Sequence, residues 1–277
     1  MKYFDAHAHY LGRQYSKDRD RLLTEMHKGG VKYIVNSTHG AELEHGLRLA
    51  KKYDFLYLSI LSDDYYDKNI DYEANGHLID EKFEKTIARL TRLCLDNKKI
   101  VAYGEFGMDF RRVQPTKSEV AKQAFWFKKD LEAARQLKLP VVIHSGNACQ
   151  FVFDALKEAD MPDYGHGKGM IHCYLGTPEM ALEYIEMGYL ISITGLVTHK
   201  SARGKNLVEV VKKIPLKNMV IETDSPYLTP EPCAPRARND SSKLKLVVEK
   251  IAELKGISPQ KVAESTTAKT KAFFGIS

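Results

Sequence analysis

Eight short apolar segments, spread along the whole chain and separated by helical patterns, constrain the fold of this sequence more than any other feature. They are rich in Val, Ile, Leu and Tyr, and they begin near Tyr3, Val31, Phe55, Ile100, Leu139, Gly169, Tyr189 and Met219. Most are nearly continuous apolar runs rather than strict alternations, which is typical of parallel strands buried on both faces. The sequence therefore predicts eight buried parallel strands with helices between them.

The segment between the fourth and fifth apolar runs shows the helical pattern most clearly. Its apolar side chains recur at helical spacing, at Val120, Ala124, Phe127, Leu131 and Ala134. Thr116, followed three residues later by Glu119, is typical of a capping box. We therefore expect a helix that begins directly after Thr116.

Eight strand and helix units fit one architecture best. The chain has 277 residues and no linker rich in Gly, Ser or Pro, which predicts a single (β/α)8 barrel over residues 1–277, with its active site at the carboxyl ends of the strands. The alternative is an open, doubly wound sheet. The first strand lacks the GxGxxG pattern of a dinucleotide site, so we expect no dinucleotide cofactor.

Composition excludes several other classes of protein. With 43% apolar and 28% charged residues, the chain is not a disordered tail, a coiled coil, a collagen or a disulfide miniprotein. Four widely separated cysteines without a CxxC pair are typical of reduced thiols. No run approaches the ~18 apolar residues that span a bilayer. We expect a soluble, cytoplasmic, monomeric protein without membrane association, and its net charge of +6 is too evenly interspersed to define a partner.

Ionisable side chains occur at the predicted strand ends. The first strand closes with His7 and His9, which are two residues apart and therefore point to the same face. The fourth, fifth, sixth and eighth strands end around Glu105, His144, His172 and Asp224. Each is individually compatible with an ordinary polar position at a barrel rim. Because the carboxyl ends of parallel barrel strands meet on one face, the six together predict one site.

The chemistry of these side chains predicts a divalent metal centre. Imidazole and carboxylate ligands suit Zn²⁺, Mn²⁺ or, less well, Mg²⁺, and the lack of a thiolate argues against a structural zinc. Because six ligands are too many for one tetrahedral ion, we expect two ions, one held by His7, His9 and Asp224 and the other by His144 and His172, with Glu105 bridging. Two ions ~3.5 to 4 Å apart can activate a shared water, so the predicted reaction is metal-assisted hydrolysis.

Three acidic residues have more specific expected roles. Asp224 is the predicted general base, because a carboxylate beside the water can accept its proton. Glu105 is the predicted bridge, and unlike a lysine it needs no carboxylation to join two ions. Glu222, two residues before Asp224 on the same strand face, either orients a ligand or pairs with a neighbouring Arg or Lys.

In their order and spacing these motifs resemble the TatD-related DNase family. The similar elements are Asp5 to His9 (DxHxH), Gly104 to Asp109 (GEIGLD), Leu139 to Ser145 (LPVIIHS), Ile171 to Tyr174 (HCF), Ser192 to Gly195 (SxSG) and Ile221 to Leu228 (ETDSPYL). The resemblance covers nearly the whole chain. It implies a (β/α)8 barrel, divalent metals on the six residues above, and hydrolysis of phosphodiesters, often as 3′ to 5′ exonuclease action on DNA. Like Glu222, Asp109 is a candidate for a residue that supports the ligands without binding metal itself.

Several phosphate-facing elements of the family are altered. Where the family has GxHP after strand three, this chain has Ser59-Ile60-Leu61-Ser62, and where the family has Arg-Asp after strand five, it has Gly146-Asn147. The family's RGKRNEP motif is only partly kept over residues 236–240, and Lys269 replaces an Asn of the family. A guanidinium suited to bidentate phosphate binding is therefore missing after strand five. The candidate substrate contacts are Arg111, Arg112, Arg236, Arg238 and Asn239. Each of the four arginines is equally compatible with an ordinary solvated surface position.

The stretch from Ser62 to His77 is long for a connection between a strand and a helix. Its acidic residues, which oppose the docking of a polyanion, are Asp63, Asp64, Asp67, Asp71 and Glu73. Its tyrosines, expected to pack over the barrel mouth rather than to stack on bases, are Tyr65, Tyr66 and Tyr72. The sequence thus defines the metal centre better than the substrate.

Three hypotheses about function follow from these features. The first is a two-metal phosphodiesterase acting on DNA or another phosphodiester. The second keeps the same centre but hydrolyses an ester, lactone or amide in a small substrate. The third is a nucleic-acid-binding protein without catalytic activity, whose metals only hold the barrel together.

Overall fold

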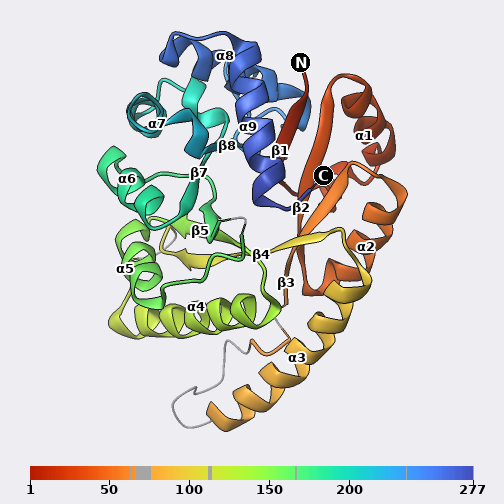
Figure 1. The fold of residues 1–277 in the computed structure, drawn as a ribbon, viewed down its shortest axis with the longest axis vertical. Coiled ribbons are helices and arrows are strands. Elements are labelled where there is room, and N and C mark those ends of the chain that lie inside the picture. The colour runs from red at the N-terminus through yellow and green to blue at the C-terminus, as the bar shows by residue number, and fades with distance from the viewer. Residues whose placement is uncertain (63, 67–75, 112–113, 166, 235, 277) are drawn as a thin grey trace.

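A computed structural model describes residues 1–62, 64–66, 76–111, 114–165, 167–234 and 236–276. Eight parallel strands form one sheet in sequential order (Figure 1). They are β1 (Tyr3–Ala8), β2 (Val31–His39), β3 (Leu56–Leu61), β4 (Ile100–Asp109), β5 (Val141–Gly146), β6 (Gly169–Ile171), β7 (Tyr189–Ile193) and β8 (Met219–Ile221). A parallel bridge between Ala8 and Ser225 joins the two ends of the sheet into a nearly closed barrel.

Helices alternate with the strands and surround the barrel. The α-helices of the described residues are α1 (Arg19–Lys28), α2 (Leu43–Lys52), α3 (Gly76–Asp96), α4 (Lys117–Leu137), α5 (Cys149–Ala159), α6 (Pro178–Glu186), α7 (Ala202–Lys213), α8 (Leu244–Lys255) and α9 (Pro259–Phe273). Short 3-10 helices lie at 13–15, 40–42, 195–198, 216–218 and 241–243. The strand order confirms the predicted barrel, and the open doubly wound sheet is wrong.

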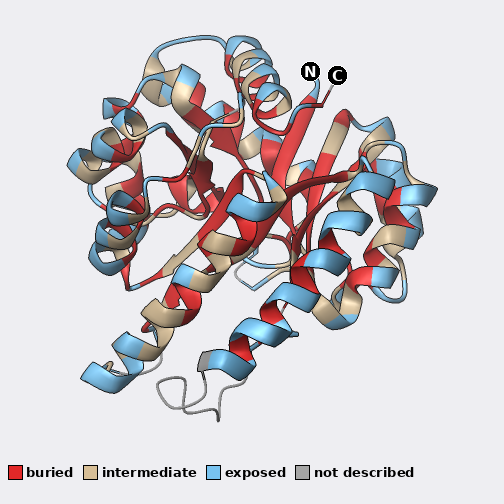
Figure 2. Cartoon of the chain, turned by 60° about the horizontal axis from the view of Figure 1, so that its bottom comes forward, coloured by how far each residue is buried: buried red, intermediate tan, exposed pale blue. Residues whose placement is uncertain are grey.

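The predicted strands and the predicted helix start are observed. Each strand begins within two residues of its expected position, and the strands are largely buried while the helices expose their outer faces (Figure 2). The capping box at the start of α4 is present: Glu119 N donates to Thr116 Oγ1 at 3.2 Å, and Thr116 N donates to Glu119 Oε2 at 2.7 Å. Both were predicted because they depend on local sequence alone.

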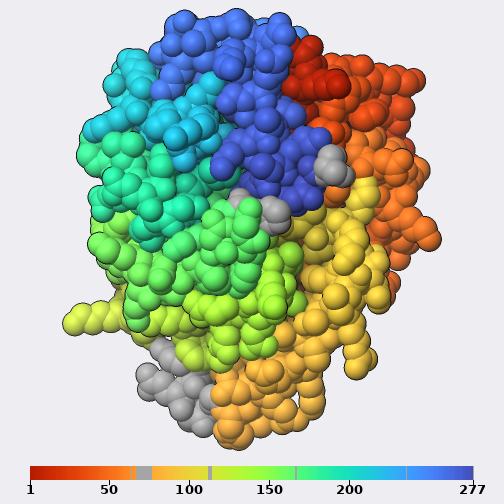
Figure 3. All heavy atoms as spheres, in the orientation of Figure 1, coloured from red at the N-terminus to blue at the C-terminus, as the bar shows by residue number. Residues whose placement is uncertain are grey.

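The two ends of the chain lie side by side. Figure 3 shows the C-terminal helices against the N-terminal segment, and Thr267 Oγ1 donates to Lys2 O at 3.3 Å. Phe273 and Phe274, where α9 ends, join an apolar cluster of barrel side chains that includes Phe4, whose ring stacks on Phe274 with centroids 5.9 Å apart.

The described tyrosines of the stretch after β3 pack against helices. The ring of Tyr65 is 5.1 Å from that of Phe83 on α3, and the ring of Tyr66 is 4.8 Å from that of Trp126 on α4. Neither tyrosine lines the cavity described below. Of the acidic residues predicted to oppose a polyanion, Asp64 pairs with Arg89. The other acidic residues, Asp63, Asp67, Asp71 and Glu73, lie outside the described residues, as does Tyr72.

No described helix is both long and apolar enough to cross a membrane.

Candidate metal centre

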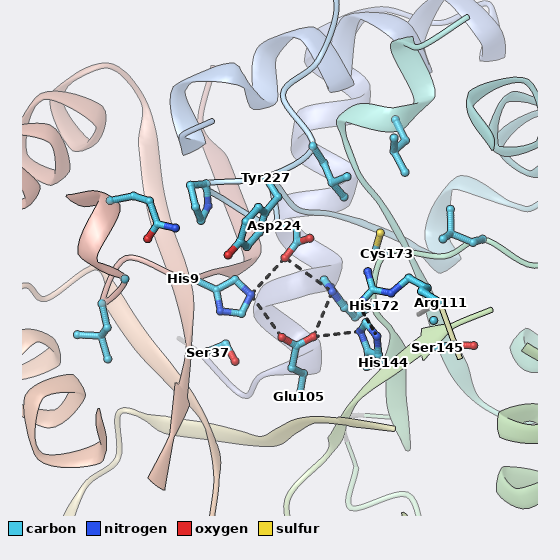
Figure 4. A pocket seen from close by; sticks show the side chains of 18 of the residues that line it. His9, Ser37, Glu105, Arg111, His144, Ser145, His172, Cys173, Asp224 and Tyr227 are labelled. Carbon is cyan, nitrogen blue, oxygen red and sulfur yellow. Dashed lines mark hydrogen bonds and ion pairs between the residues drawn. The ribbon is translucent and has the colours of Figure 1, made fainter. Parts of the chain in front are cut away.

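The carboxyl ends of the strands open into a cavity of about 810 Å³ (Figure 4). The sixth predicted ligand, His7, is fully buried and does not line the cavity. The other five line it: His9, Glu105, His144, His172 and Asp224. They come from β1, β4 and β5 and from the segments that follow β6 and β8. The structure therefore brings together all six side chains that the sequence singled out.

His7 and His9 point at each other across the floor of the cavity. Their Nε2 atoms are 3.1 Å apart, and His9 Nε2 is 3.2 Å from Asp224 Oδ1. Burial and the nearby charge of His172 lower the pKa of His7. The pKa of His9 is raised, because the carboxylates of Asp224 and Glu105 outweigh the effect of burial. Two imidazole nitrogens this close are what convergence on a cation requires.

Glu105 lies at the centre of the cluster. Its Oε1 is 3.4 Å from His9 Nε2 and 3.6 Å from His7 Nε2. Its Oε2 is 3.3 Å from His172 Nε2 and 3.5 Å from His144 Nδ1. Burial raises the pKa of Glu105, but the imidazoles, first His7 and then His172, lower it well below its usual range. An ionised carboxylate with one oxygen turned to each imidazole pair is suited to bridge two cations.

A tight backbone contact positions Glu105. The preceding residue, Gly104, has φ +135°, and a Cβ there would lie 2.4 Å from Val142 O on β5. Only glycine adopts this conformation readily and fits this space. The pairing of β4 with β5 is irregular between Gly104 and Phe106, which turns the Glu105 side chain toward the cavity.

Carboxylates on the far side of two imidazoles orient their rings. His172 Nδ1 is 2.8 Å from Oε1 of the fully buried Glu222, and His144 Nε2 is 3.3 Å from Asp109 Oδ2. In a neutral imidazole one nitrogen carries the proton and the other accepts. If the protonated nitrogen faces the outer carboxylate, the lone pair faces Glu105, which is the arrangement of a metal-ligating histidine.

Asp224 is positioned by the same backbone that closes the barrel. Its N donates to His7 O at 3.0 Å, and its φ of 54° directs the chain back across β1. The adjacent Thr223 donates through N and Oγ1 to Asp5 at 2.9 and 2.6 Å. Burial raises the pKa of Asp5 to about 7, although these hydrogen bonds and that from Ser241 lower it. Asp5 thus joins β1 to β8 and contributes no ligand atom to the cluster.

The donor atoms fit a divalent cation. Three groups of ligand atoms lie within 4.8 Å of one another: His7, His9 and Glu105; His7, His172 and Asp224; and Glu105, His144 and His172. The third group contains the same residues, His144, His172 and Glu105, that were predicted around one of the two ions. The second places His172 near Asp224, with 3.8 Å between Nε2 and Oδ1, so the predicted division of ligands between two ions remains a prediction.

The predicted substrate contacts are dispersed. Arg111 lines the cavity, whereas Arg236, Arg238 and Asn239 are not among the described residues of its wall. Arg238 forms a bidentate pair with Asp18, at 2.8 and 2.7 Å. Asn239 is buried and donates to the carbonyls of the turn after β8. Arg236 is exposed, and Arg112 lies outside the described residues.

The cavity wall also contains residues that were not predicted as site residues, among them Tyr227, Cys173 and Arg203. Tyr227 is 55% exposed at the cavity wall, with its ring centroid 6.4 Å from that of His9. Cys173 and Arg203 also line the cavity. Tyr227 and Cys173 lie in the segments 221–228 and 171–174, which resemble motifs of a known family. That resemblance could have identified both as site residues. Arg203 belongs to none of these motifs. It reaches the cavity because of the path that the chain takes after β7, and no local pattern predicts that path.

The sequence profile of the TatD related DNases matches residues 4–275. The chain belongs to the TatD related DNase family. Family membership agrees with the clustered ligands, all six of which come from elements that resemble TatD motifs.

Curated relatives of this TatD-related protein match it along nearly its whole length. A protein of Bacillus subtilis named as the uncharacterized metal-dependent hydrolase YabD is 32% identical over 276 residues, with 99% of each chain covered. The 3′-5′ ssDNA/RNA exonuclease TatD of Erwinia amylovora is 28% identical over 277 residues, covering 99% of this chain and 100% of its own. Both relatives agree with the membership of this chain in the TatD related DNase family, and the first carries the name of a metal-dependent hydrolase.

A solved structure supports the fold independently. The crystal structure of YjjV, a TatD homologue from Escherichia coli, superposes with a TM-score of 0.81 at 23% identity, covering 99% of this chain and 98% of the other.

Proposed function

We propose that this TatD-related protein is a two-metal phosphodiesterase that removes nucleotides from the 3′ end of single-stranded DNA. The observation that carries the proposal is the position of Glu105, whose two oxygens each face a different pair of imidazoles at 3.3 to 3.6 Å. The name of the Erwinia relative, a 3′-5′ ssDNA/RNA exonuclease, supports the choice of bond and of substrate.

The proposal assigns the ions to the six clustered residues. One would be held by His7, His9 and Asp224, whose Oδ1 is 4.0 and 3.2 Å from the two Nε2 atoms, and the other by His144 and His172, with Glu105 shared. When bound, the two ions supply Lewis-acid activation of water and neutralise charge on the phosphate.

The protein's own groups then orient the reactants and move the proton. Asp224 faces the cavity, and its pKa is lowered because the hydrogen bond from His9 and the neighbouring imidazoles outweigh burial. Its carboxylate is therefore ionised and can accept the proton of the attacking water. Glu222 and Asp109 hold the imidazoles of His172 and His144 in their orientations. Of the predicted phosphate contacts, Arg111 already faces the cavity, whereas Arg238 would have to leave Asp18.

The alternative proposal is hydrolysis of a carboxyl ester, lactone or amide in a small substrate. It is favoured by the apolar part of the cavity wall, which contains Leu11, Leu175, Leu196 and Leu228. A small substrate with an apolar group would fit beside such a wall better than a charged strand would. Turnover of carboxyl esters without any turnover of bis(p-nitrophenyl) phosphate would favour this alternative.

The decisive experiment is an exonuclease assay on a 5′-labelled single-stranded oligonucleotide with Mn²⁺ or Mg²⁺. We expect the wild type to shorten the strand progressively from its 3′ end and His144→Ala to lose this activity. His77→Ala, which changes an exposed histidine on α3, is the matched control and should behave as the wild type does. Equal cleavage by the wild type and His144→Ala would contradict the proposal. Binding of DNA without cleavage by fully metal-loaded protein would indicate a non-catalytic role.

A further inference from the structure

Gly146, the last residue of β5, leaves a space that two side chains of β4 and its following loop fill. A Cβ on Gly146 would lie 2.3 Å from Asp109 Oδ1 and 2.8 Å from Arg111 Nε. The backbone at this point is held by a hydrogen bond of 2.7 Å from Phe110 N to Gly146 O, so the strands cannot separate easily to admit a side chain. Any larger residue at 146 must therefore displace Asp109 and Arg111.

Asp109 holds the guanidinium of Arg111 through several contacts. Arg111 Nε is 3.0 and 2.9 Å from the two carboxylate oxygens, and Nη2 also contacts Oδ2. The backbone N of Arg111 donates to Oδ1 at 2.9 Å. Asp109 is in turn fixed by Gln123, which accepts from Asp109 N at 2.8 Å and donates to Asp109 O at 3.2 Å. The guanidinium is thus oriented before any ligand arrives.

This orientation places the guanidinium beside a predicted metal ligand. Arg111 Nη2 is 3.4 Å from His144 Nε2, and Figure 4 shows the two side chains next to each other at the cavity wall. The Arg111 side chain is 49% exposed, and its Nη1 has no hydrogen-bond partner within the described part of the chain. That nitrogen remains available to an anion in the cavity.

We propose that Arg111 binds a non-bridging phosphate oxygen of the substrate beside His144, with Asp109 and Gly146 as positioning residues. The inference rests on the proposed phosphodiesterase function and specifies how this chain recognises the phosphate. A guanidinium presents a planar set of donors that matches phosphate. Asp109 orients those donors, and Gly146 acts by having no side chain. The site then selects an anionic ester over a neutral one.

The test compares Arg111→Ala, Arg111→Lys, Gly146→Ala and the double variant Gly146→Ala/Arg111→Ala in manganese-loaded protein. The affinity for inorganic phosphate is measured by calorimetry, the manganese content by elemental analysis, and KM and kcat with single-stranded DNA. We expect Arg111→Ala to weaken phosphate binding and raise KM by about tenfold or more at unchanged manganese content. Arg111→Lys should recover part of the loss.

The double variant tests the role of Gly146. If Gly146 acts only by making room for Arg111, Gly146→Ala should weaken phosphate binding, and the double variant should be no weaker than Arg111→Ala. Losses that add in the double variant would overturn the role of Gly146. The matched control Arg203→Ala removes the same charge from the same cavity. It should cost about threefold or less, because the described residues provide Arg203 with no fixed partner, and such an exposed charge contributes little.

Three results would overturn the role of Arg111: wild-type phosphate affinity in Arg111→Ala, an equal loss in Arg203→Ala, or no phosphate binding by the manganese-loaded wild type. Failure of the proposed function has a different signature. In that case the wild type would leave DNA uncleaved, while phosphate binding would still depend on Arg111.

Discussion

The carboxylate of Glu222 lies 2.8 Å from His172 Nδ1, on the side of the ring opposite Glu105. Glu222 is fully buried, and its Oε1 also accepts a hydrogen bond of 2.6 Å from Cys173 N. Burial lowers the pKa of His172, but Glu222 and the other carboxylates outweigh it and raise the pKa to about 10. Among the described residues Glu222 contacts a predicted ligand and pairs with no Arg or Lys, which favours the first of the two roles expected for it.

Glu222→Gln should weaken metal binding while keeping the fold. The amide oxygen can still accept from Cys173 N, but a neutral group supports the basicity of His172 less, so we expect a loss in metal affinity of about 10- to 100-fold. Titration with Mn²⁺ or Zn²⁺ monitored by calorimetry measures this change. The matched control is Glu209→Gln, an exposed residue of α7. Unchanged affinity in Glu222→Gln would remove Glu222 from the support of the site.

Asp224→Asn should retain the fold and lose most turnover. The amide cannot accept the proton of the attacking water, which corresponds to a loss of about 10²- to 10⁴-fold in kcat. The measurement is kcat on single-stranded DNA, together with the metal content of the purified variant. A rate close to that of the wild type would exclude Asp224 as the general base.

Glu105→Gln should lower the amount of bound metal. The substitution removes the charge that faces both imidazole pairs, so at least one ion should lose occupancy. Elemental analysis of the purified variant, compared with the wild type and with Glu209→Gln, measures the metal content per chain. Identical metal content in all three proteins would contradict a bridging role.

The buried carboxyl of Asp130, which is not one of the predicted metal ligands, should make the stability of the protein depend on pH. Tyr65 and Tyr103 donate to Asp130 Oδ1 at 2.5 and 3.4 Å. Burial raises the pKa of Asp130 to about 7, although these hydrogen bonds lower it. Between about pH 4 and pH 7 the folded protein therefore keeps a proton that the unfolded chain has released, so the free energy of unfolding falls as pH rises through this range.

Asp130→Asn should remove this contribution, because the amide does not titrate. We expect the fall in thermal stability between pH 5 and pH 8 to be shallower in Asp130→Asn than in the wild type. Asp154→Asn, which changes an exposed carboxylate on α5, should keep the wild-type slope. Parallel curves for the wild type and Asp130→Asn would show that Asp130 does not titrate in this range. Asp5 titrates over a similar range in all three proteins, so it does not affect the comparison.

Much of the fold and the ligand set was predictable because both depend on local pattern. Continuous apolar runs marked the strands, and most of the predicted ligands lie near or just after a strand end, as His7 on β1 and His144 on β5 show, whereas Glu105 lies in the middle of β4. Parallel strands in a barrel all present their carboxyl ends on one face, so six positions far apart in the sequence predicted one site. The contacts of the cavity wall were less predictable.

By itself, the sequence determined the barrel and the residues available to bind metal, since periodicity and strand ends are properties of short segments. Only the tertiary structure decided which charges face the cavity. Arg238 pairs with Asp18, 220 positions away, whereas Arg111 reaches His144 because Gly146 leaves room for it. An ion pair between distant residues depends on the path of the loops that carry them, and no local pattern encodes that path.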